Sequence, residues 1–172
     1  MRDAALLGAR LLLGGYMGIH ASQKLLGKFH GPGLEKISEI FEDGGLYPGK
    51  HHAIAAAGAE IVGGVLTITG FADPAGPLAV AGAMTVAATF NREGGLMAAR
   101  GGVELPVAYA TLALTLAATG PGKYRLGPPL PEGVATVGAL LGGLAAGAIV
   151  AKMITSKPAP ADVPAEPAAP DA

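Results

Sequence analysis

Five apolar runs, separated by short polar segments, limit what this chain can fold into. Each run has about 15 to 22 residues, which at about 1.5 Å per helical residue approaches the roughly 30 Å hydrocarbon core of a bilayer. The chain is 51% hydrophobic and only 15% charged, so it lacks the polar surface of an ordinary water-soluble domain. The sequence therefore predicts an all-α membrane protein, with spans at 4–22, 52–71, 76–90, 103–119 and 133–154.

Two connecting segments constrain how these runs are arranged. Between the first two runs, Leu34, Ile37 and Phe41 recur at helical spacing among charged residues, which predicts an amphipathic helix near 33–44 at the membrane interface. The Asp73-Pro74 turn between the second and third runs leaves room only for a tight helical hairpin. We therefore expect these two runs to form neighbouring helices.

The chain divides into three expected parts. Residues 1–126 are expected to form a four-helix membrane domain, and residues 127–155 a linker with a fifth membrane helix. Residues 156–172 alternate Pro, Ala, Asp and Glu, a composition that cannot bury enough apolar surface to become ordered. This last part is therefore predicted to be a disordered tail.

The fifth run decides the predicted orientation in the membrane. Its glycines repeat at four-residue spacing, in the pairs Gly138/Gly142 and Gly143/Gly147, which lets membrane helices approach closely. If this run crosses, the positive-inside rule makes the face opposite the N-terminus cytoplasmic, together with the tail. If it does not cross, the basic residues divide almost evenly and the orientation stays open. With five spans, the N-terminal face has Arg2, Lys123 and Arg125, and the other face has Lys24, Lys28, Lys36, Lys50, Arg92, Arg100, Lys152 and Lys157.

Two ionisable residues lie deep inside the predicted spans and need a physical explanation. Glu60 is about eight residues into the second run, roughly 12 Å deep and close to the bilayer midplane. It is either a structural group, protonated or paired with Arg10, or a proton-handling or ligand-binding carboxyl group. Arg10 either extends to the interface along its aliphatic stem or approaches Glu60. Its position also argues against the alternative that the first run is a cleaved secretory signal.

Alternating helices bring a set of polar residues to the face where the first span ends. His20, Gln23 and Lys24 share one side of the first helix because they are three and four residues apart. With Glu60 deeper beneath them, they predict a polar pocket in which Glu60 and His20 are the candidate catalytic groups. The alternative is a belt of solvated interfacial side chains. The predicted pocket residues are Arg10, His20, Gln23, Lys24, Glu60, Asn91, Arg100 and Glu104.

Composition and spacing oppose several classes of function. The net charge of −1, with scattered Lys and Arg, provides no basic surface for nucleic acid. The chain has no cysteine and therefore no disulfide or thiolate metal ligand. His30, His51 and His52 lack further ligands at metal-binding spacing, so no metal site is predicted. The expected partners are membrane lipid, other proteins or a second copy of the chain.

The order and spacing of several short motifs resemble the DoxX family of small bacterial membrane proteins over roughly residues 5–126. The motifs come from the predicted first helix, its connecting loop, the segment around Glu60 and the fourth helix. They are Arg10-Leu11, Gly14, His20 and Gln23-Lys24-Leu25; Gly31-Pro32-Gly33-Leu34-Glu35 and Gly45-Leu46; Ala59-Glu60-Ile61-Val62-Gly63-Gly64 and Gly70; Glu104; and Gly120-Pro121-Gly122-Lys123-Tyr124.

Three positions depart from the pattern of the family that the chain resembles. Ala21 stands where Gly is frequent, Asn91 where His is common, and Arg125-Leu126-Gly127 where Ser-Leu-Asp is usual. Because an amide does not titrate, Asn91 argues against proton transfer at the end of the third predicted span.

The resemblance implies a four-helix membrane core, to which the fifth helix and the Ala/Pro-rich tail look like additions of the kind seen in actinobacterial relatives. Members of the family are linked to quinone-coupled thiosulfate oxidation in archaea and to membrane complexes with superoxide dismutase and a sulfurtransferase in mycobacteria. The resemblance thus implies quinone as a candidate ligand, redox enzymes as partners and no intrinsic cofactor.

Three functional hypotheses follow. In the first, the chain is an accessory membrane subunit of a redox-linked complex, rather than an autonomous catalyst. Its pocket around Glu60 and His20 either holds a quinone head group or couples proton movement to the electron transfer of a partner. In the second, it is a non-catalytic scaffold or assembly factor that docks soluble partners, with Glu60 and Arg10 holding the bundle together. The third, a small-solute transporter, is disfavoured because no inverted repeat is visible.

Overall fold

The structure is a computed structural model that describes residues 1–156, and this part of the chain contains helices and no strand. Two short 3₁₀ helices, η1 (Arg92–Gly94) and η2 (Ala98–Arg100), connect α4 to α5. The predicted tail, including Lys157, lies outside the described residues from residue 157 onward. The α-helices are α1 (Arg2–Leu26), α2 (Gly33–Asp43), α3 (Gly49–Thr69), α4 (Ala75–Asn91), α5 (Glu104–Thr119) and α6 (Glu132–Thr155).

The all-α prediction is confirmed, and each apolar run forms one helix close to its expected limits. The amphipathic connector forms α2, whose Phe41 is buried while Glu35, Lys36, Glu39 and Asp43 are exposed. Three helices, α1, α3 and α6, are long and apolar enough to cross a membrane. α5 is a shorter apolar helix, and α4 has 17 residues, or roughly 25 Å of helix.

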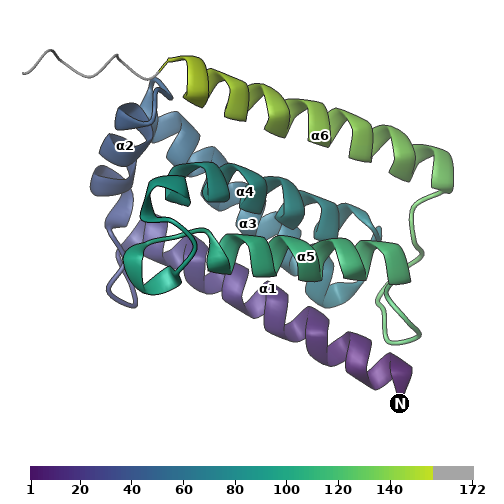
Figure 1. The fold of residues 1–172 in the computed structure, drawn as a ribbon. Coiled ribbons are helices and arrows are strands. Elements are labelled where there is room, and N and C mark those ends of the chain that lie inside the picture. Colours follow the sequence, from purple (N-terminus) through teal and green to yellow (C-terminus); the bar gives the residue numbers. More distant parts are fainter. Residues whose placement is uncertain (157–172) are drawn as a thin grey trace, which may run out of the picture.

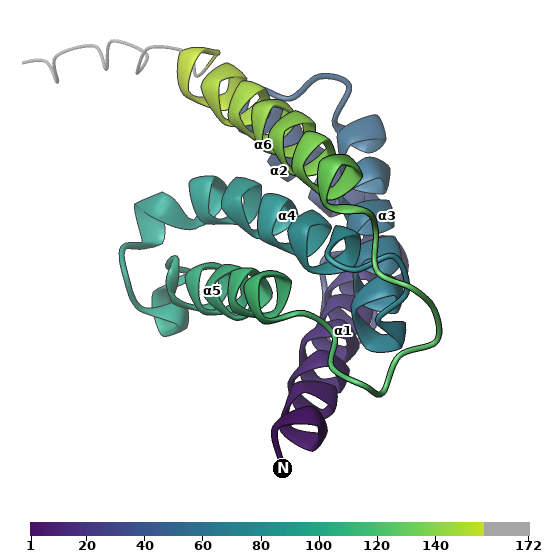
Figure 2. The same ribbon diagram turned by 90° about the vertical axis from the view of Figure 1, so that its right-hand side faces the viewer.

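The helices pack side by side, with α1, α4 and α6 running in one direction and α3 and α5 in the other. α1 packs on α3, α3 on α4, and α4 on both α5 and α6. Both views show α4 between α5 and α6, with α6 on the outside of the bundle (Figure 1, Figure 2). At one end, here called the N-terminal end, lie the start of α1, the turn between α3 and α4 and the loop before α6. At the other, the α2 end, α1, α4 and α6 finish beside α2.

The turn between α3 and α4 confirms the predicted helical hairpin. α3 ends at Gly70, whose φ of 63° is in the left-handed region that glycine adopts without steric cost. Its N–H donates a hydrogen bond to the carbonyl oxygen of Leu66, which closes the last turn. The chain then enters α4 after four residues, so α3 and α4 lie side by side.

Close helix contacts occur at glycines, although not at those expected from the fifth run. A Cβ atom added at Gly14 of α1 would lie 2.6 Å from the Gly64 carbonyl oxygen of α3, so neither position has room for a larger side chain without a shift. On α6, a Cβ added at any of the four repeated glycines meets no atom within 4 Å. The expected close approach through these glycines is therefore wrong for contacts within residues 1–156, and α1 and α3 form the tight pair instead.

Two buried clusters hold the helices together. The larger cluster joins α1, α4 and α5 through residues such as Leu13, Val80 and Leu116. The smaller one lies at the α2 end, where Phe41, Leu46, Ala53 and Met153 bring together α2, α3 and α6. This second cluster ties the amphipathic helix to the ends of two apolar helices, and the cavity described below adjoins it.

Candidate functional site

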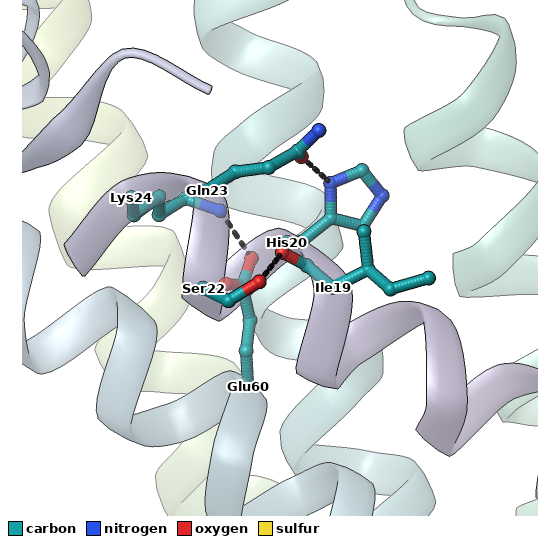
Figure 3. A network of polar contacts seen from close by, with 6 residues as sticks. All are labelled: Ile19, His20, Ser22, Gln23, Lys24 and Glu60. Carbon is teal, nitrogen blue, oxygen red and sulfur yellow. Dashed lines mark hydrogen bonds and ion pairs between the residues drawn. The ribbon is translucent and has the colours of Figure 1, made fainter. Parts of the chain in front are cut away.

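An ion pair between a buried carboxylate and a half-buried lysine joins α1 to α3 toward the α2 end. Glu60 lies midway along α3 and is 2% exposed, and Lys24 lies in the last turn of α1. Lys24 Nζ donates a hydrogen bond to Glu60 Oε1 over 2.6 Å. Figure 3 shows the two side chains reaching toward each other from different helices. The tight packing of α1 on α3 thus gives Glu60 the partner that a buried carboxylate requires.

The remaining oxygen of this carboxylate is not satisfied within the chain. Glu60 Oε2 is buried and has no hydrogen-bond partner among residues 1–156. Leaving a buried acceptor unpaired costs about 1–3 kcal/mol, so such an atom needs a reason. Glu60 is also one of the residues that line the cavity described below.

His20 is held in one orientation by its neighbours. Its Nδ1 lies 3.1 Å from Gln23 Oε1, and the Gln23 amide nitrogen donates to the carbonyl oxygen of Phe29 over 3.3 Å. On the other side, the His20 ring meets the Tyr109 ring edge-on at 5.7 Å, and Tyr109 packs on Tyr16 at 5.5 Å. The predicted spacing of His20 and Gln23 on one helix face therefore produces a fixed imidazole (Figure 3).

A cavity of about 1060 Å³ extends from these residues along α4 and α6. Its wall on α6 carries only Val, Ala, Gly and Ile, whereas its ionisable and amide side chains come from the other helices. Most of these groups lie toward the α2 end, with Glu60 deeper in the bundle. They are His20, Lys24, His52, Glu60, Asn91 and Tyr109. The cavity therefore has a polar part and a long apolar part, a pattern that suits an amphiphilic ligand.

Arg10 lies at the N-terminal end and has a separate role. It is 2% exposed, and its guanidinium donates four hydrogen bonds of 2.5 to 2.8 Å to backbone carbonyl oxygens. These bonds cap the end of α3 and fix the loop after α5, and the acceptors are Thr67, Ile68, Pro121 and Tyr124. The alternative of a pair with Glu60 is wrong, because the Arg10 guanidinium bonds to these carbonyl oxygens at the N-terminal end instead.

Asp73 lies beside this arginine, in the turn between α3 and α4. It is 6% exposed, and burial raises the pKa of its carboxyl group, although the charges of Arg10 and Arg125 act in the opposite direction. The group lies away from the cavity and is not one of its lining residues. Asp73 and Arg10 are thus part of the packing at the N-terminal end.

The structure separates the remaining predicted pocket residues. Asn91 lines the cavity, and its amide donates to the carbonyl oxygen of Gly102 over 3.2 Å. Glu104 is exposed and accepts a hydrogen bond from the backbone N–H of Ala98, which fixes the loop before α5. Arg100 is exposed in that loop and does not line the cavity. Asn91 therefore belongs to the polar part of the cavity, and the other two belong to the connecting loop.

Sequence reasoning missed Tyr109 and His52 as cavity residues. Tyr109 comes five residues after Glu104, and this spacing places it more than one turn inside α5. An aromatic side chain with a polar group, inside an apolar run and at the depth of His20, is the signal that could have identified it. Among residues 1–156, no group of three or more His, Asp or Glu side chains is placed to hold a metal ion.

These features define a helical membrane protein with a buried ion pair in the polar part of an otherwise apolar cavity. The DoxX family model matches residues 5–92, which cover α1 to α4 and more than half of the chain. The chain belongs to the DoxX family. The matched region includes Lys24, Glu60 and His20, and it stops before α5, which the motif resemblance had included. Comparisons with curated proteins and with solved structures find no match.

Proposed function

We propose that this DoxX-family chain is an integral-membrane subunit of a redox-linked complex and that its cavity binds the head group of a quinone. The proposal rests on the Lys24–Glu60 ion pair, whose carboxylate is buried and whose two residues line the polar part of a cavity of about 1060 Å³. A membrane quinone has a flat polar ring and a long apolar tail, and the cavity has the same two-part character. Redox enzymes are the proposed partners, since the cavity supplies binding groups rather than an electron carrier of its own.

The residues of the cavity fit such a ligand. Lys24 offers ammonium protons to a ring oxygen, and the rings of His20 and Tyr109 offer flat surfaces beside a planar head group. The small apolar residues of α6 offer a wall for the tail. When bound, a quinone supplies two-electron redox chemistry, and the residues of this chain would bind it, orient it and limit the access of water.

The proposed membrane arrangement has five crossings in the cell membrane. It is supported by α4 and α5, which lie antiparallel beside the three helices long enough to span (Figure 1). In this arrangement residues 1–126 form the four-helix domain, α6 is an added span, and the α2 end, with the tail, faces the cytoplasm. The polar part of the cavity then lies toward the cytoplasmic half of the bilayer.

A cavity-filling variant tests the proposal. Gly82 of α4 lines the cavity, and a Cβ added there meets only Ala146 Cβ, at 4.0 Å. We expect Gly82→Leu to weaken binding of a short-chain benzoquinone to the full-length protein in nanodiscs by about tenfold or more, because the leucine fills the space of the ligand. Gly15→Leu is the matched control, since Gly15 of α1 is exposed and a Cβ there meets nothing within 4 Å.

The same titration separates the proposal from the scaffold alternative. If the wild-type protein binds no quinone, or if Gly82→Leu and Gly15→Leu bind as well as wild type, the cavity is not a quinone site. The scaffold or assembly factor then becomes the better account, and it predicts that Glu60→Gln changes only the abundance of the protein and of its partner complex.

A further inference from the structure

We infer that the cavity selects the reduced, hydroxyl-bearing quinol over the oxidised quinone. This inference rests on the proposed function and names the redox form of the ligand that the site takes. It is carried by two polar atoms of cavity-lining residues that have no partner among residues 1–156, Glu60 Oε2 and His20 Nε2. In the ionised Glu60 and the neutral His20 both atoms accept hydrogen bonds, and neither donates one.

Glu60 provides the first acceptor. As the ionised partner of Lys24, which donates to its Oε1 over 2.6 Å, Glu60 has carboxylate oxygens that only accept hydrogen bonds. Its Oε2 is buried without a partner among residues 1–156, on a side chain that is 3% exposed and lines the cavity. A ligand that fills the cavity satisfies this atom only if it brings a donor.

The hydrogen bonds of Gln23 identify the second acceptor. The carbonyl oxygen of Phe29 can only accept, so the Gln23 atom facing it is the amide nitrogen, and Gln23 Oε1 must face His20. An amide oxygen also only accepts, so His20 Nδ1 bears the proton in this contact. In the neutral imidazole Nε2 then has the free lone pair, and no residue in 1–156 donates to it.

The two redox forms of a quinone differ in whether they can donate hydrogen bonds to these two acceptor atoms. The quinol has two hydroxyl groups that donate, whereas the quinone has two carbonyl oxygens that only accept and would be repelled by a carboxylate lone pair. Lys24 does not discriminate between the forms, because its ammonium donates to a hydroxyl oxygen as well as to a carbonyl oxygen. The preference therefore depends on Glu60, with a smaller contribution from the uncharged His20.

Ligand chemistry alone supplies the first test. The full-length protein in nanodiscs is titrated with a short-chain quinol, with the matching quinone, and with the dimethyl ether of the quinol, which keeps the ring but has no donor. One hydrogen bond to a charged acceptor predicts that the quinol binds about tenfold to a hundredfold more tightly than the other two. A tenfold preference also raises the midpoint potential of the bound couple by about 30 mV.

Variants attribute the preference to the two atoms. Glu60→Gln puts an amide nitrogen, a donor, in the place of Oε2, so the preference should disappear or reverse, and His20→Phe should reduce it while keeping a ring beside Tyr109. Glu39→Gln is the control, because it removes the same charge from a side chain that is 62% exposed on α2. If all ligands bind equally, or the quinone binds best, the inference is wrong and the quinone site stands. If no ligand binds, the proposed function fails as well.

Discussion

The two ends of this bundle each bury a charge, and they satisfy it in different ways. Arg10 and Glu60 are both 2% exposed. Arg10 has four backbone acceptors at the N-terminal end, and no cavity residue is among them. Glu60 has one partner, Lys24, and an oxygen left over beside a cavity. Burial alone therefore does not distinguish a structural charge from a functional one, whereas the count of satisfied hydrogen-bonding atoms does.

The difference also explains why the two charges do not meet. Arg10 and Lys24 are 14 residues apart on α1, which corresponds to about 21 Å along the helix axis. Lys24 is the residue of α1 that reaches the level of Glu60, and Arg10 reaches the end of α3. Each of these two cations of α1 thus binds a different part of α3.

The largest predicted effect comes from removing the two cations in turn. Arg10→Met leaves four carbonyl oxygens without their donor, and we expect it to lower the free energy of unfolding by roughly 3–5 kcal/mol. Lys24→Met removes one ion pair, and Glu60 can then become neutral by taking up a proton. We therefore expect it to lower the free energy of unfolding by only roughly 1–3 kcal/mol. Thermal unfolding in detergent, followed by circular dichroism because the chain has no Trp, measures both. If the two variants lost equal amounts of stability, the proposed difference between the two ends of the bundle would be wrong.

A smaller effect concerns the pH dependence at the N-terminal end. Burial raises the pKa of Asp73 above its ordinary value of 3.8, so the folded state binds this proton more tightly than the unfolded state does. Its contribution to stability is therefore present below about pH 4 and is lost as the pH rises through the raised pKa. We expect Asp73→Asn to weaken the fall in Tm as the pH rises above about 4.

The control for this prediction is the wild-type protein in the same buffers, since other groups titrate over the same range. Only the difference between the two pH profiles reports on Asp73. A variant that became less stable than wild type as the pH rose would mean that the charges of Arg10 and Arg125 outweigh burial at Asp73.

Most of the fold could be predicted from the sequence, because apolar runs, glycines and prolines act locally. The limits of α2 and the hairpin of α3 and α4 follow from such signals. The candidate site was predicted only in part. Alternating helices place His20 and Lys24 above Glu60 in the same half of the bundle. The partner of Glu60 depends in addition on how α1 packs against α3, where Gly14 and Gly64 are in close contact.

Other features of the site were beyond sequence reasoning for the same reason. The four carbonyl oxygens around Arg10 come from α3 and from the loop after α5, more than 50 residues away along the chain. Every residue has a backbone carbonyl group, so the sequence does not indicate which of them bind the arginine. Arg100 and Glu104 have the polarity of a pocket residue, and only the path of the loop between α4 and α5 directs them away from the cavity.

The central claim is that the incompletely satisfied Glu60 marks a site for a membrane-borne quinone ring. Its most direct test is to irradiate the full-length protein with a photoreactive quinone in nanodiscs and to map the adducts by mass spectrometry. The account predicts adducts on cavity residues near Glu60, such as those around His20 and Tyr109, and competition by unmodified quinone. Adducts confined to the outer faces of α1 and α6, unchanged by competitor, would contradict it.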